Sequence, residues 1–175
     1  MISYTDIVLK TFAFIKTDIP QDLYDHIWSL DFPDTGIDPE EIRYKIQGTD
    51  EVTRKKIIEY ILSQDIDPSL MVFIKDFQFD INKIRQNEFV PMHNEVSQKS
   101  PFEVVFWLTK TDNYQGREFI MLKNGIESRI QPKNGTMCFL DTTPPDVYHG
   151  VSKLITDTEI ITVTGGTGRK NVRQD

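Results

Sequence analysis

Apolar positions follow a helical period in two stretches of the first 70 residues and mostly a strand period from Met71 onward. They recur every three or four positions in residues 21–30, and Pro20 directly before them suits the start of a helix. Asp50 is a good N-cap for a second helix, whose apolar stripe consists of Val52, Ile58, Ile61 and Leu62. Asp67-Pro68 ends this section. The pattern therefore predicts two helices in the N-terminal part of the chain.

Short apolar runs separated by turn residues predict strands elsewhere. In the N-terminal part, Ile7–Ile15 and Ile42–Ile46 are strand candidates, and Phe32–Pro39 is a predicted loop. The later runs are Met71–Phe79 (or Met71–Ile84), Phe89–Val96, Phe102–Thr109, Glu118–Leu122, Glu127–Ile130, Thr136–Leu140, His149–Ser152 and Glu159–Thr164. Eight short strands with regular turns predict a sandwich or a small barrel.

Length, charge and cysteine content narrow the class of protein. A chain of 175 residues with 38% hydrophobic residues suits one globular domain. Its net charge of −7 opposes nucleic-acid binding, which needs clustered Lys and Arg. One cysteine, Cys138, excludes an internal disulfide and paired-cysteine zinc sites. No signal peptide is recognised in Met1–Lys16 and no run reaches the ~20 apolar residues of a membrane span, so we expect a cytoplasmic protein.

Candidate metal ligands stand at His93, Glu95 and His149. In an extended strand, residues two positions apart point to the same face, so His93 and Glu95 can reach one metal ion. His149 lies 56 residues further on (149 − 93 = 56), far enough to arrive on another strand of the same barrel. Two imidazoles and one carboxylate are the ligand set of a mononuclear non-haem iron site with open coordination positions.

Five blocks then carry a family resemblance. They are Phe89–Glu95, Val104–Thr109, Gly116–Phe119, Ile130–Phe139 and His149–Val151. Their order and spacing resemble the Fe(II)/2-oxoglutarate-dependent oxygenases, in particular the prolyl-4-hydroxylase-like branch, although Glu95 stands where Asp is the commoner ligand. The resemblance implies a mainly β fold: a double-stranded β-helix, which is a jelly-roll or cupin-like barrel, with two N-terminal supporting helices.

The resemblance also implies how one domain of residues 1–175 is organised. Residues 1–70 would supply the first strand and the supporting helices, residues 71–165 the barrel core, and residues 166–175 a mobile tail. The iron ion would sit in the mouth of the barrel, held by His93, Glu95 and His149, with 2-oxoglutarate and O2 as co-substrates.

One departure from the family concerns 2-oxoglutarate. The family places Arg or Lys nine or ten residues after the distal His, where it pairs with the far carboxylate of the co-substrate. Here those positions hold Thr158 and Glu159, and matching the last strand puts Thr158 at the expected spot. Trp107 replaces a pocket-lining tyrosine of the family and could equally be a core residue. Substitute cations could come from other strands, at Lys83, Arg85, Lys110, Arg117 or Arg129.

Three functional hypotheses follow. The first is an Fe(II)/2-oxoglutarate-dependent dioxygenase that hydroxylates, or otherwise oxidises, a C–H bond of a peptide or small metabolite. The second is an Fe(II) oxygenase that does not use 2-oxoglutarate, which would explain Thr158. The third is a cupin-like metal-binding module or a decayed, non-catalytic oxygenase. The acidic composition favours a cationic metabolite or a basic peptide over an anionic substrate, and neither nucleic acid nor a membrane is an expected partner.

Overall fold

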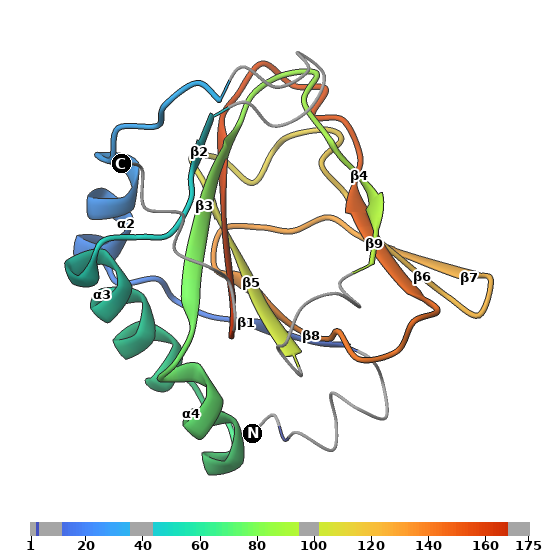
Figure 1. Cartoon of the computed structure of the whole chain (residues 1–175). Helices are drawn as coiled ribbons and strands as arrows, with labels where there is room; N and C mark the ends of the chain where they lie inside the picture. Colours follow the sequence, from blue (N-terminus) through green and yellow to red (C-terminus); the bar gives the residue numbers. More distant parts are fainter. Residues whose placement is uncertain (1–2, 4–11, 36–43, 95–101, 168–175) are drawn as a thin grey trace.

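The computed structural model describes residue 3 and residues 12–35, 44–94 and 102–167, and within them two antiparallel sheets face each other (Figure 1). The larger sheet has the order β1 (Phe12–Lys16), β8 (Thr136–Asp141), β5 (Phe102–Thr109), β10 (Ile160–Gly166), β3 (Gln78–Ile84) and β2 (Tyr44–Ile46). The smaller sheet has the order β4 (Val90–His93), β9 (Val147–Val151), β6 (Phe119–Lys123) and β7 (Ile126–Ile130). This mainly β architecture confirms the predicted fold class.

Three helices cover the outer face of the larger sheet: α2 (Gln21–Trp28), α3 (Glu51–Leu62) and α4 (Pro68–Ile74). Asp50 caps α3 as predicted, because its carboxylate accepts the backbone N–H of Thr53 at 2.9 Å. Val52 does not belong to the apolar stripe of α3, since it is 65% exposed. The side chains that α3 buries are Thr53, Ile57, Ile58, Tyr60 and Ile61.

The prediction of a strand from Met71 was wrong, because residues 71–74 form the end of α4. Asp67 accepts the backbone N–H of Ser69 at 2.8 Å, and Pro68 occupies the first helical turn, so this pair starts a helix instead of ending the helical section. Leu70 and Ile74, four residues apart, then point into the core on one helical face. The strand begins only at Gln78 and ends at Ile84.

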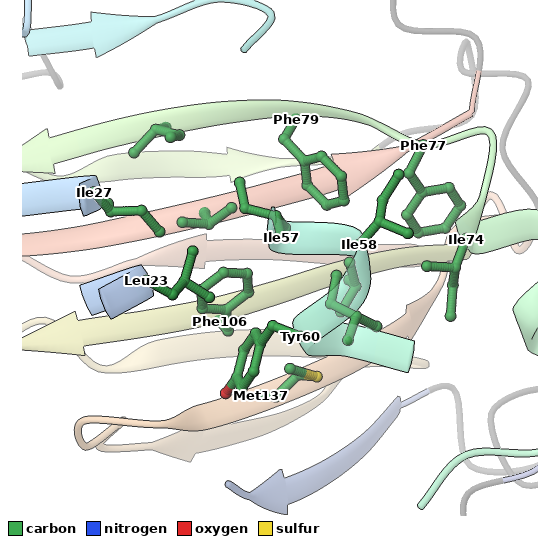
Figure 2. Close-up of a cluster of buried hydrophobic side chains, with 14 of the residues drawn as sticks. Leu23, Ile27, Ile57, Ile58, Tyr60, Ile74, Phe77, Phe79, Phe106 and Met137 are labelled. Atoms are coloured by element: carbon green, nitrogen blue, oxygen red, sulfur yellow. The ribbon is translucent and has the colours of Figure 1, made fainter. Parts of the chain in front are cut away.

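Two cores separate the layers. The first lies between the helices and the larger sheet, and its buried cluster includes Leu23 and Ile27 of α2 and Phe79 and Phe106 of the sheet (Figure 2). The second lies between the two sheets and draws its side chains from both of them. β5 is buried on both faces, so its residues alternate between the cores: Phe106 points to the helices and Trp107 to the barrel interior.

Some predictions fall on residues that the structure does not describe. Part of the first strand, part of the Phe32–Pro39 loop and the tail from residue 168 lie outside the described residues, as does Glu95. Cys138 lies in the interior core, and its burial raises the pKa of the thiol, as expected of an unreactive cysteine. Within the described ranges, every helix is too short or too polar to cross a membrane.

Candidate active site

His93 and His149 face each other on neighbouring strands of the smaller sheet. β4 and β9 are antiparallel, and His93 lies directly opposite His149 in their register. The centroids of the two imidazole rings are 4.3 Å apart and the ring planes are inclined by 55°. A register irregularity lies between Val90 and His93, and bulges of this kind re-aim side chains next to functional sites. The predicted pair of histidines is therefore brought together.

The pair lies on the inner face of the barrel. His149 is opposite Met121 of β6, and Met121 belongs to the core between the sheets. His149 is 7% exposed, whereas Tyr148 is 40% exposed on the outer face, as the alternation of a strand predicts. His93 is half-buried. One imidazole is thus inside the barrel and the other stands nearer to solvent.

A backbone contact fixes the tautomer of His93. Its Nδ1 lies 2.8 Å from the carbonyl oxygen of Pro91. Because a carbonyl oxygen only accepts, Nδ1 carries the proton and Nε2 is the nitrogen able to bind a metal ion. A backbone carbonyl behind a ligating histidine is a common arrangement in metal sites. Imidazoles suit iron, so the two histidines fit the predicted ion.

Gly150 allows β4 to lie close to β9. A Cβ atom at this position would be 2.9 Å from the carbonyl oxygen of Val90 and 3.1 Å from the Cα of Met92, both closer than an ordinary contact. The close approach keeps His93 opposite His149. The sequence analysis did not single out Gly150, although an isolated glycine within a strand pattern is a known sign of close backbone approach.

The third predicted ligand, Glu95, is not among the described residues. Within the described ranges, no group of three His, Cys, Asp or Glu side chains is arranged to hold a metal ion. The role of Glu95 therefore stays a prediction.

Aromatic rings extend from the histidines into the barrel. The ring of Phe119 lies 5.9 Å from that of His149, and the ring of Trp107 lies 5.6 Å from that of Phe119. Trp107 is completely buried in the core between the sheets. Its indole Nε1 has no hydrogen-bond partner among the described residues. Trp107 thus lines the interior beyond the histidines and holds an unused N–H donor there.

Arg117 is the cation buried in this interior. Its side chain is 1% exposed, and its Nη2 donates to the Oγ1 of Thr162 at 3.1 Å. Within the part of the chain that the structure describes, its Nε and Nη1 have no hydrogen-bond partner. Burial lowers the pKa of Arg117 to about 9, against the opposing effects of Tyr114 and Glu88. The guanidinium is therefore still charged at neutral pH.

Three other candidate cations lie away from the barrel interior. Lys83 is on the helix-covered side of the larger sheet, with its Nζ 5.9 Å from the ring centroid of Trp28. Lys110 and Arg85 each lie 3.3 Å from a carboxylate oxygen of Glu159. Burial opposes ionisation of Glu159, but these cations hold its pKa below the ordinary value. Their positions do not fit contact with a co-substrate inside the barrel, and Glu159 does not face that space.

Arg129 also lies outside the interior. Arg129 lies on β7, about half exposed, and pairs with Glu118 at 3.0 Å and with Glu127 at 2.6 Å. Thr158 is half-buried before the start of β10, where its backbone N–H bonds to the carbonyl of Thr156 at 2.9 Å. Of the five cations that the sequence offered, the structure brings only Arg117 to the space between the sheets.

Comparison with known proteins shows similarity in fold. No protein-family model matches the sequence, and no curated protein matches it. A prolyl-4-hydroxylase from Pseudomonas putida matches with a TM-score of 0.59 and 18% identity, over 95% of this chain and 96% of that one. The viral collagen prolyl hydroxylase of Paramecium Bursaria Chlorella virus-1, solved as a 2OG complex, matches with a TM-score of 0.61 and 11% identity, over 89% of this chain and 94% of that one. The chain therefore has the jelly-roll fold of these prolyl hydroxylases.

Proposed function

We propose that this chain is a non-haem Fe(II) oxygenase that uses 2-oxoglutarate and O2 to oxidise a C–H bond. The observation that carries the proposal is the pair of opposed histidines, His93 and His149, whose rings lie 4.3 Å apart on the inner face of the smaller sheet. The fold shared with two prolyl hydroxylases, one of them solved as a 2OG complex, supports it.

The chain's own residues have two tasks in this reaction. His93 through Nε2, His149 and the predicted ligand Glu95 would hold the ion from one side and leave the other coordination positions open. Phe119 and Trp107 form apolar walls beside the histidines, which keep water away from the reacting groups. A bound ferrous ion supplies O2 binding and the redox chemistry, with one oxygen atom oxidising 2-oxoglutarate to succinate and CO2 and the other oxidising the substrate.

The substrate is a peptide or a small metabolite in this proposal. The net charge of −7 favours a cationic molecule over an anionic one, because the field of the protein attracts the opposite charge. Hydroxylation is the reaction that we expect.

An anaerobic titration tests the proposal. Fe(II) should bind to the wild-type chain, and 2-oxoglutarate added afterwards should develop a visible metal-to-ligand charge-transfer band. His93→Ala and His149→Ala should each lose Fe(II) binding while keeping the far-UV circular dichroism of the wild type. His26→Ala is the matched control, because the third histidine of the chain lies on α2 in the helical layer, where its Nε2 is 2.8 Å from Thr53 Oγ1.

Each outcome selects one hypothesis. Fe(II) binding with the band supports the proposal. Fe(II) binding and substrate-dependent O2 consumption without the band would instead support an oxygenase that does not use 2-oxoglutarate. A wild-type chain that binds no Fe(II) under reducing conditions contradicts both and leaves a non-catalytic module.

A further inference from the structure

We propose that Arg117 binds the far carboxylate of the dicarboxylate co-substrate. The cation that holds this carboxylate would then belong to the segment before β6 and not to β10. The inference rests on the proposed function and deepens it. It names the residue that selects a dicarboxylate over other 2-oxo acids.

The first support is a buried guanidinium whose hydrogen-bond donors are not all satisfied, although the charge of Glu88 acts on it. A charged side chain that is 1% exposed is rare unless it is paired. Arg117 donates one N–H of Nη2 to Thr162, and its Nε and Nη1 have no acceptor in the described parts of the chain. Buried donors are satisfied in the great majority of cases. A carboxylate fits this guanidinium, because its two oxygens can accept two parallel N–H groups at once, the second N–H of Nη2 together with one from Nε or Nη1.

The second support is the place of the guanidinium. Thr162 of β10 lies directly opposite Trp107 of β5 in the register of the larger sheet. Trp107 points into the core between the sheets. Its ring contacts the ring of Phe119, which in turn contacts the imidazole of His149. A molecule that binds a metal ion at the histidines and extends into the barrel therefore approaches Arg117.

Neighbouring donors complete an anion site. Thr162 Oγ1 accepts from Arg117, so its own hydroxyl proton is available to a carboxylate oxygen. Trp107 Nε1 is buried without an acceptor in the described ranges. Two arginine N–H groups, one hydroxyl and one indole N–H thus converge on the same interior from three segments of the chain.

The backbone around Arg117 holds its side chain in place. Gly116 has φ +78° and Arg117 has φ +58°, which is uncommon for a residue other than glycine. The Arg117 backbone N–H bonds to the carbonyl of Lys153 at 3.0 Å, and a Cβ at position 116 would clash with that same carbonyl. Such conformations persist where the surrounding structure enforces them, often at ligand sites. Here the turn carries Arg117 inward, whereas Glu118 beside it pairs with Arg129 outside.

The test compares two ligands on two variants. The chain is loaded with Zn(II), which does not undergo redox chemistry, and titrated by calorimetry with 2-oxoglutarate or with 2-oxopentanoate. The second ligand has the same 2-oxo acid end and chain length but no far carboxylate. The wild type should prefer 2-oxoglutarate on the order of 100-fold, the loss expected for hydrogen bonds to a charged group. Arg117→Gln should bind both ligands equally weakly.

Arg129→Gln is the matched control, because it removes an arginine of β7, the strand that pairs with β6, whose side chain pairs with surface carboxylates. It should keep the wild-type preference. Thermal unfolding of the metal-free chain gives a second readout: a salt-bridge role for Arg117 predicts that Arg117→Gln lowers the unfolding temperature, whereas an empty anion site predicts no loss. Should Arg117→Gln not fold, Arg117→Lys keeps the charge without the planar fork and should retain part of the preference.

The outcomes separate this inference from the proposed function. A wild-type chain that binds neither Zn(II) nor Fe(II) fails the proposed function. A wild-type chain that binds the metal but does not discriminate between the two ligands overturns the role of Arg117 alone. An Arg117→Gln chain that folds and keeps the preference for 2-oxoglutarate overturns it as well.

Discussion

The close approach of β4 to β9 makes Gly150→Ala the most informative single change at the histidine pair. Gly150 directly follows His149, so the position of its missing side chain is on the face of the strand opposite to the His149 imidazole. Its missing side chain leaves room for the backbone of Val90 and Met92. A methyl group there should push β4 outward and carry His93 away from His149.

The size of the displacement follows from the contact distances. A Cβ at position 150 would lie 2.9 Å from the carbonyl oxygen of Val90, where 3.4 Å is an ordinary contact, so β4 must move by about 0.5 Å. A metal site tolerates roughly 0.2 Å in its ligand distances. Disturbing residues that orient metal ligands typically costs about 10–100-fold in metal affinity, or roughly 1.4–2.7 kcal/mol.

Anaerobic titration with Fe(II) measures the effect, and circular dichroism verifies that the variant is folded. Gly125→Ala is the control: its φ is +74°, so alanine strains the backbone at a cost of roughly 1–2 kcal/mol, but an added Cβ contacts nothing within 4 Å. Gly125→Ala should lose stability and keep the wild-type affinity for Fe(II). If folded Gly150→Ala binds Fe(II) as tightly as Gly125→Ala does, the distance between β4 and β9 does not set the site.

Two further predictions concern the helix-covered core. The Tyr60 hydroxyl bonds to Thr17, so Tyr60→Phe should cost about 1 kcal/mol at pH 7. Burial raises the pKa of Tyr60 above the 10.0 of an unfolded chain, so the wild type should lose stability above pH 10 and Tyr60→Phe should lose less. Urea unfolding at pH 8 and pH 10.5 should therefore show a smaller difference in unfolding free energy between the two proteins at the higher pH. Gly165→Ala would place a methyl group against the buried ring of Phe79 and should destabilise by about 1–3 kcal/mol, with the Fe(II) affinity of the folded fraction unchanged; a wild-type unfolding temperature would contradict the packing described for β10.

β5 was predicted with its observed bounds, whereas α4 was missed, for a physical reason. β5 has the predicted bounds, Phe102–Thr109, because a run buried on both faces is mostly apolar, here with the exception of Glu103, and stops where turn residues begin. The run from Met71 is equally apolar, but a short apolar run suits a strand or a buried helix alike. Asp67-Pro68 before it was the deciding signal, since together the two residues start α4.

In the candidate site, the two histidines could be predicted from the sequence and the inward cation could not. The meeting of His93 and His149 was predicted from their residue types and spacing together with the family resemblance of the five blocks, and the register irregularity before His93 did not prevent it. The inward cation could not be selected, because a shift of one residue turns a strand side chain from one face to the other. For Arg117 the outcome depends on a left-handed turn at Gly116 and Arg117, and a sequence pattern does not specify that conformation when the second residue is an arginine.

The missing cation on β10 and the buried cation before β6 have one explanation. An anion inside the barrel needs a positive charge in the space between the sheets. The charge can come from any segment of the chain that reaches this space. On β10 the inward positions are Ile160, which lies in the interior core, and Thr162, whose hydroxyl oxygen accepts a hydrogen bond from Arg117. Glu159 points outward to Lys110 and so does not repel a dicarboxylate in the interior. A position-by-position comparison of β10 would therefore reject a dicarboxylate ligand, whereas the charge at Arg117 favours one.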